Sequence, residues 1–151
     1  MERLNLPEYP FKISSTDGRT QIFDGVRKKY VTLTPEEWVR QHFVEYLVHE
    51  KDVPRSLIAV EMPLKYHKLN KRSDIVVYSK SGAPALIVEC KAPHIKINQN
   101  VFDQIARYNL ALQVPYLVVT NGMEHFCCLI DREVRNYRFL DFLPDYEQIN
   151  R

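Results

Sequence analysis

The sequence predicts an α/β protein with a central mixed β-sheet flanked by helices. Two segments, residues 34–50 and 98–113, carry apolar side chains at helical spacing, and short apolar runs lie between and after them. A helix, three strands, a second helix and further strands are together typical of a sheet that packs between helices. The chain has 151 residues, of which 45% are hydrophobic, so it is long enough to form one domain with a buried core.

The first thirty residues predict a small β appendage in front of this core. Residues 9–13, 17–25 and 28–33 resemble short strands that are interrupted by turn residues. We therefore expect a single domain over residues 1–151, with the appendage at 1–30, the core at 31–131 and a C-terminal extension at 132–151.

The first helix of the core has a clear start. Thr34 is a good N-cap, Pro35 suits the first helical position, and Glu37 follows Thr34 at the spacing of a capping box. The apolar stripe of this helix consists of Val39, Phe43, Tyr46 and Leu47. Glu36 extends that stripe by one turn towards the N-terminus, whereas Glu37 lies off it.

The strands of the core follow this helix. Residues 56–66 and 73–78 are strand-like, residues 79–84 have the composition of a turn, and residues 85–91 form a nearly continuous apolar strand. Such a strand is expected at a central position, buried on both faces. The second helix has Val101, Ile105, Tyr108 and Leu112 on its predicted core side, and residues 115–122, 125–131 and 134–142 complete the predicted sheet.

Composition and charge narrow the function classes. The net charge of +2 does not by itself indicate a nucleic-acid-binding protein, although residues 27–29 and 65–72 are basic clusters. Cys90, Cys127 and Cys128 fit neither a disulfide framework nor a zinc site, so we expect buried thiols in a reducing cytosol. No apolar run approaches the roughly 20 residues of a membrane span, and the first residues lack a signal-peptide core, so we expect a cytoplasmic protein without membrane contact.

Three charged residues stand at the ends of the two central strands. Glu89 and Lys91 share one face of their strand, and a hairpin turn at residues 79–84 brings Asp74 beside them. Because two neighbouring carboxylates repel, a divalent metal such as Mg²⁺ or Mn²⁺ is a natural partner, with the backbone carbonyl of Cys90 as a further ligand. Lys91 would orient or deprotonate a metal-bound water. The alternative is that these acids pair with lysines for purely structural reasons.

The segments "SDIVVY" (73–78) and "ALIVECKAP" (85–93) resemble the motif of the PD-(D/E)XK nuclease superfamily. The chain is most similar to the N-terminal nuclease domain of type I restriction enzyme R subunits. The supporting segments are "TPEEWVRQ" (34–41), "VEMPL" (60–64), "DQIARY" (103–108) and "VVTNG" (118–122). This resemblance implies a restriction-endonuclease-like core of the order αβββαβ and a Mg²⁺-dependent endodeoxyribonuclease. It includes no helicase motor, so ATP-driven restriction is not implied.

The resemblance also implies roles for individual residues. Asp74 and Glu89 would be metal ligands, Lys91 the catalytic lysine, and Gln104 a residue near the site. A glutamate of the first helix would complete the acidic cluster. Glu36 is the candidate because of the side of the helix on which it lies, and Glu37 is the alternative. Ser73 replaces the proline of the motif, a frequent departure.

DNA is the partner that these assignments imply. The candidate phosphate contacts are Arg27, Lys28, Lys29, Lys68, Lys71 and Arg72. Action as a homodimer or with a partner protein remains open. The alternative function is a non-catalytic or weakly catalytic DNA-binding module that assists a partner protein.

Overall fold

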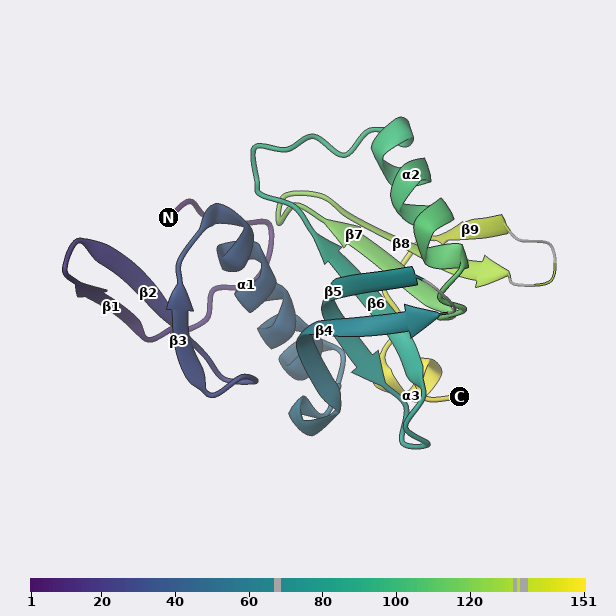
Figure 1. The fold of residues 1–151 in the computed structure, drawn as a ribbon, viewed down its shortest axis with the longest axis horizontal. Coiled ribbons are helices and arrows are strands. Elements are labelled where there is room, and N and C mark those ends of the chain that lie inside the picture. The colour runs from purple at the N-terminus through teal and green to yellow at the C-terminus, as the bar shows by residue number, and fades with distance from the viewer. Residues whose placement is uncertain (67–68, 132, 134–135) are drawn as a thin grey trace.

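The computed structural model describes residues 1–66, 69–131, 133 and 136–151, and for residues 63–72 it describes no side chains. In this part of the chain, a three-stranded sheet and a six-stranded sheet lie on opposite sides of helix α1 (Figure 1).

The small sheet consists of β1 (Ile13–Thr16), β2 (Arg19–Asp24) and β3 (Lys29–Thr32), paired antiparallel in that order. Asp17 and Gly18 join β1 to β2 with φ angles of 52° and 74°, the left-handed conformation that a two-residue type I′ turn requires. The predicted β appendage is therefore confirmed. Its first strand begins at Ile13 instead of near Tyr9, because Pro10 has no backbone N–H to donate to a ladder.

Helix α1 (Pro35–Glu50) begins as predicted. The side chain of Thr34 accepts a hydrogen bond from the backbone N–H of Glu37 at 3.0 Å. Val39, Phe43 and Leu47 are fully buried against the six-stranded sheet. The opposite side of α1 faces the small sheet, so the helix is covered on both sides (Figure 1).

The six-stranded sheet is mixed. Its strands are β4 (Ile58–Tyr66), β5 (Leu69–Tyr78), β6 (Pro84–Cys90), β7 (Tyr116–Thr120), β8 (His125–Asp131) and β9 (Asn136–Leu140), in that spatial order. The short 3₁₀ turn η1 (Arg55–Leu57) precedes β4. Only β6 and β7 pair in parallel among the neighbouring strands described, and helix α2 (Gln99–Leu110) connects them. The arrangement confirms the predicted mixed sheet with flanking helices.

The core has two layers, one on each face of the six-stranded sheet. Leu86 and Val88 of β6 pack with α1, whereas Ile87 packs with α2 on the opposite face. All three side chains are at most 1% exposed, and burying each contributes roughly 1.5–3 kcal/mol. The prediction that this strand is central and buried on both faces is therefore confirmed.

The predicted core side of α2 is partly confirmed, because Ile105 and Leu112 pack against the core, but it missed the fully buried residues. The buried residues of this helix are Phe102, Ala106 and Asn109, whereas Tyr108, expected in the core, is 37% exposed. The ring of Phe102 packs against the rings of Phe126, Tyr137 and Phe139, at 4.7 Å between centroids for Phe139. These partners lie in β8 and β9, far along the sequence from α2.

The C-terminal helix α3 (Tyr146–Ile149) packs on the same face as α1. Its Tyr146 hydroxyl donates a hydrogen bond to the carbonyl of Tyr78 at 3.0 Å, which fixes it to the end of β5. All three cysteines are buried free thiols, as predicted. Within the described residues, no helix has both the length and the apolar character needed to cross a membrane.

Candidate active site

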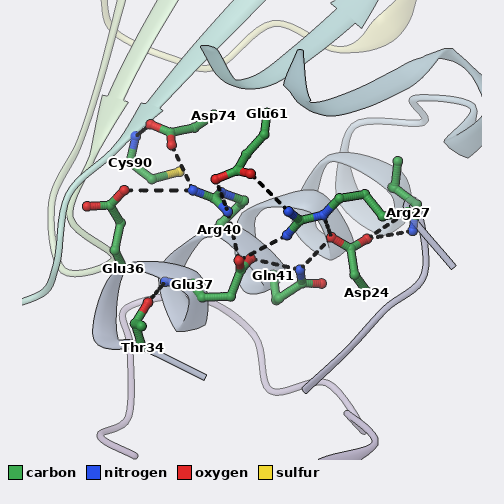
Figure 2. Close-up of polar contacts among 11 residues, drawn as sticks. Asp24, Arg27, Thr34, Glu36, Glu37, Arg40, Gln41, Glu61, Asp74 and Cys90 are labelled. Atoms are coloured by element: carbon green, nitrogen blue, oxygen red, sulfur yellow. Dashed lines mark hydrogen bonds and ion pairs between the residues drawn. The ribbon is translucent and has the colours of Figure 1, made fainter. Parts of the chain in front are cut away.

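Asp74 lies against the end of β6. Its Oδ2 accepts a hydrogen bond from the backbone N–H of Cys90 at 2.8 Å. Cys90 is the residue between Glu89 and Lys91 in the sequence. Its Oδ1 accepts a hydrogen bond from Nη2 of Arg40 at 2.9 Å (Figure 2). The hairpin of β5 and β6 therefore places the Asp74 carboxylate beside the backbone that joins Glu89 to Lys91.

Arg40 of α1 is the central cation of the site, and the sequence analysis did not identify it. Its side chain is 6% exposed and lies among four carboxylates. The distances from its terminal nitrogens are 2.7 Å to Glu37, 2.9 Å to Asp74, 3.4 Å to Glu61 and 3.7 Å to Glu36. Burial disfavours its charge, but Glu37 and Asp74 outweigh that effect and raise the pKa of Arg40. The helical spacing of Arg40 from Glu36 and Glu37 was the available signal.

Glu37 belongs to the structural part of this cluster. Its carboxylate accepts hydrogen bonds from Arg27 at 2.9 Å, Arg40 at 2.7 Å and Gln41 at 3.0 Å. Its side chain is only 8% exposed. This engagement makes Glu37 the lesser candidate for the acid on the first helix.

Glu36 occupies the exposed side of the same turn. Its side chain is 47% exposed and its pKa is raised, first by partial burial and then by the negative charge of Asp74. The positive charges of Arg40 and Lys91 act in the opposite direction. Glu36 thus lies within electrostatic range of both Asp74 and Lys91, which favours it over Glu37 as the acid of the site.

We expect Glu36→Gln to raise the melting temperature at pH 7 by roughly 1 °C, a small effect because the charge is half exposed. A folded-state pKa above 4.5 means that the folded protein holds the proton more tightly than the unfolded chain. The stability contribution of Glu36 is therefore present below that pH and lost as the pH rises through the folded-state pKa. Thermal melts from pH 4 to pH 7 test this.

The matched control is Glu37→Gln. It removes a buried carboxylate from two guanidinium groups, so its melting temperature should fall at pH 7. A Glu36→Gln protein that melts below wild type at pH 7 would contradict the assignment of Glu36 as a carboxylate whose charge the folded protein disfavours through burial and the charge of Asp74.

The backbone beneath Glu89 and Lys91 is fixed. The N–H of Lys91 donates to the carbonyl of Thr120 at 2.8 Å, and the amide of Asn121 donates to the carbonyl of Ile95 at 2.9 Å. Both Glu89 and Lys91 are half-buried. The Cys90 thiol points into the core, where burial, followed by the charge of Asp74, raises its pKa. The thiol therefore stays protonated, and only the backbone of Cys90 remains available as a ligand.

A divalent cation fits the donor chemistry of this site, although no ready cage is present. In the described residues, no group of three or more His, Cys, Asp or Glu side chains is arranged to hold a metal ion. Mg²⁺ typically needs only one or two carboxylates and takes its other ligands from water and phosphate. Asp74 and Glu89 meet that requirement. Four carboxylates surround Arg40 and two of them also pair with Arg27, so acids still outnumber guanidinium groups in this cluster (Figure 2).

A cleft of about 570 Å³ opens beside the acidic residues. One side is formed by Val31 and Thr32 of β3, and another by Ala92 and His94 after β6. Its lining also includes Arg27, Thr34, Pro35, Glu36, Glu37, Arg40 and Glu61. The cleft leaves the half-exposed Glu36 side chain accessible from solvent.

The remaining predicted site residues lie in different surroundings. Lys28 and Lys29 are exposed on the turn into β3, whereas Arg27 points inward and its side chain is 17% exposed. Gln104 is exposed on α2, and among the hydrogen bonds described for Asp74 none comes from it. Lys68 and the side chains of Lys71 and Arg72 lie outside the described residues.

A mixed six-stranded sheet between α1 and α2, with an acid and a Glu-x-Lys pair at the end of two neighbouring strands, defines a restriction-endonuclease-like fold. The family model of the type I restriction enzyme R protein N terminus (HSDR_N) matches residues 35–144. The chain belongs to this family.

One solved structure supports this fold. A fragment of a proposed HsdR subunit of a type I restriction enzyme from Vibrio vulnificus YJ016 is similar, with a TM-score of 0.53 and 19% identity. The match covers 78% of this chain and 24% of that one, so the chain spans about a quarter of that fragment. A proposed nuclease of DUF820 from Anabaena variabilis ATCC 29413 matches with a TM-score of 0.46 and 12% identity over 91% of this chain and 80% of that one. No curated protein matches the chain.

Proposed function

We propose that this protein is a metal-dependent nuclease that hydrolyses phosphodiester bonds of DNA, with Mg²⁺ or Mn²⁺ as cofactor. The observation that carries the proposal is the hydrogen bond from the Cys90 N–H to Asp74, which places a carboxylate beside the Glu89–Lys91 pair. Membership in the restriction enzyme R protein family supports the same activity and DNA as the substrate.

The proposed mechanism assigns one task to each group. Asp74, Glu89 and the carbonyl of Cys90 would hold the cation, which when bound lowers the pKa of a water and offsets phosphate charge. Lys91 would orient the attacking water and stabilise the negative charge that develops on the phosphate. Glu36, whose pKa is raised by partial burial and by the charge of Asp74, would be the acid of the first helix that completes the site.

DNA would reach the site along the cleft between β3 and the segment after β6. Lys28 and Lys29 are exposed at the start of β3, where they can contact phosphates without breaking an internal ion pair. Phosphate contacts of this kind make binding weaker as the salt concentration rises. Arg27 would have to leave its carboxylate partners to contribute, so we do not include it among the phosphate contacts.

The first test is cleavage of plasmid and single-stranded DNA with Mg²⁺ or Mn²⁺. Wild-type protein should cut only with metal, and Glu89→Gln should lower the rate at least tenfold. The control is Glu147→Gln, which removes an exposed carboxylate on α3 and should leave cleavage unchanged. Metal-dependent cleavage at the wild-type rate by Glu89→Gln would contradict the proposal.

A second candidate is a DNA-binding accessory module with little or no catalysis. It is favoured by the engagement of both Asp74 oxygens, which Arg40 and the Cys90 N–H already contact. Salt-dependent DNA binding that persists in Glu89→Gln, without cleavage by wild type in either metal, would support this candidate over the first.

A further inference from the structure

The chain of ion pairs around Asp74 continues into the amino-terminal sheet. It reaches the turn between β2 and β3, where Oδ1 of Asp24 accepts hydrogen bonds from the backbone N–H groups of Val26 at 2.8 Å and Arg27 at 2.9 Å. The Asp24 side chain is 1% exposed. This closed turn directs the side chain of Arg27 inward, towards α1 (Figure 2).

Arg27 uses all three of its guanidinium nitrogens. Its Nε contacts Asp24, its Nη2 contacts Glu37 at 2.9 Å, and its Nη1 contacts Glu61 at 3.2 Å. Gln41 strengthens the junction by donating to Asp24 at 3.1 Å and to Glu37 at 3.0 Å. The planar guanidinium can hold three carboxylates at fixed positions, which a lysine ammonium on a flexible stem cannot do.

Arg27 and Arg40 share two of these carboxylates. Glu37 lies 2.9 Å from Arg27 and 2.7 Å from Arg40, and Glu61 lies 3.2 Å from Arg27 and 3.4 Å from Arg40. If Arg27 were absent, both carboxylates would draw on the positive charge of Arg40. Arg40 would then be pulled away from Asp74, whose Oδ1 it contacts at 2.9 Å.

We propose that Arg27 and Asp24 of the amino-terminal sheet are positioning residues for Asp74, acting through Glu37 and Arg40. Both residues precede residue 35, where the family match begins. The amino-terminal sheet would thus influence the site from outside the matched segment. The proposal rests on the proposed function only in taking Asp74 as a ligand of the active site. In this series of contacts Asp24 holds Arg27, Arg27 holds Glu37, Glu37 holds Arg40, and Arg40 holds the carboxylate of Asp74 in its orientation.

The test uses the Cys90 backbone amide as a reporter, since its N–H donates directly to Asp74. In Arg27→Gln and in Asp24→Asn, the amide proton resonance of Cys90 should move upfield and its hydrogen exchange should become about tenfold faster. Cleavage by both variants should fall about 10–100-fold in kcat, with KM for DNA unchanged. The control is Arg151→Gln, which removes an ion pair with Glu147 of α3, outside the chain of contacts to Asp74.

Asp24→Asn retains an oxygen that can accept the turn hydrogen bonds, so it tests the proposal even if Arg27→Gln does not fold. An unchanged Cys90 resonance in the folded variants, or an equal change in Arg151→Gln, would overturn the proposal. The amide reporter needs no metal and no DNA. If wild type did not cleave DNA, the proposed function would fail while the reporter still decided whether the sheet positions Asp74.

Discussion

Lys91→Ala should lower the rate of metal-dependent DNA cleavage by about 10²–10³-fold, the usual cost of removing one group that stabilises charge in a transition state. The truncation removes the Lys91 side chain beyond Cβ, including its ammonium group, whereas the backbone stays in place because its N–H is held by the carbonyl of Thr120. Asp74 and Glu89 remain in place, so the affinity for Mn²⁺ should change only a few-fold. Single-turnover cleavage and Mn²⁺ titration measure the two effects separately.

Lys96→Ala is the matched control for that experiment. Lys96 is exposed and lies five residues further along the same segment after β6, so its loss should leave the cleavage rate close to that of wild type. If Lys91→Ala cut DNA at the wild-type rate, the catalytic assignment of Lys91 would be wrong. A parallel loss of Mn²⁺ binding would instead show that Lys91 supports the ligands themselves.

Arg40→Ala should lower the free energy of unfolding by about 3–5 kcal/mol, the cost of leaving buried charges without their partner. The change leaves Glu37 and Asp74 facing each other across the space that the guanidinium occupied. For a chain of this size, the melting temperature should fall by about 10 °C. Denaturant titration at pH 7 gives the free energy, and millimolar Mg²⁺ should restore part of it by supplying positive charge.

Arg55→Ala provides the comparison for Arg40→Ala. Its partner Glu45 is 21% exposed and its own side chain is 34% exposed, so this ion pair should contribute only about 1 kcal/mol. Equal losses in the two variants would show that Arg40 acts as an ordinary surface ion pair, and would remove the reason to treat it as the central cation of the site.

The sequence was sufficient for the fold because its apolar patterns are strong. The continuous apolar run of β6 indicated a buried central strand, and the capping residues at the start of α1 indicated where that helix begins. The pairing of Asp74 with the end of β6 also followed from the hairpin alone. By contrast, Phe102 on the buried side of α2 packs against Phe139, which is 37 positions away in sequence. Periodicity contains no information about such distant packing.

The same limit applies to the site. Helical spacing could suggest that Glu36 and Glu37 point in different directions. It could not show which of the two carboxylates would be held by hydrogen bonds from buried arginines. Asp24 and Gln41 meet across a sequence separation of 17 residues, and Arg27 and Glu61 across 34. These contacts exist because α1 is packed between two sheets, so they could be recognised only once both sheets were in place.

The packing of α1 between two sheets has a consequence for how this protein can be divided. Six consecutive residues of the helix, 39–44, are buried, including the polar Arg40, Gln41 and His42. A fragment trimmed to the family match at residue 35 would expose this side and leave Glu37 without Arg27. The boundary that sequence similarity draws is therefore not a folding boundary. If such a trimmed fragment were inactive, the loss of activity would reflect the disrupted packing of α1. It would not show that the intact protein lacks the activity.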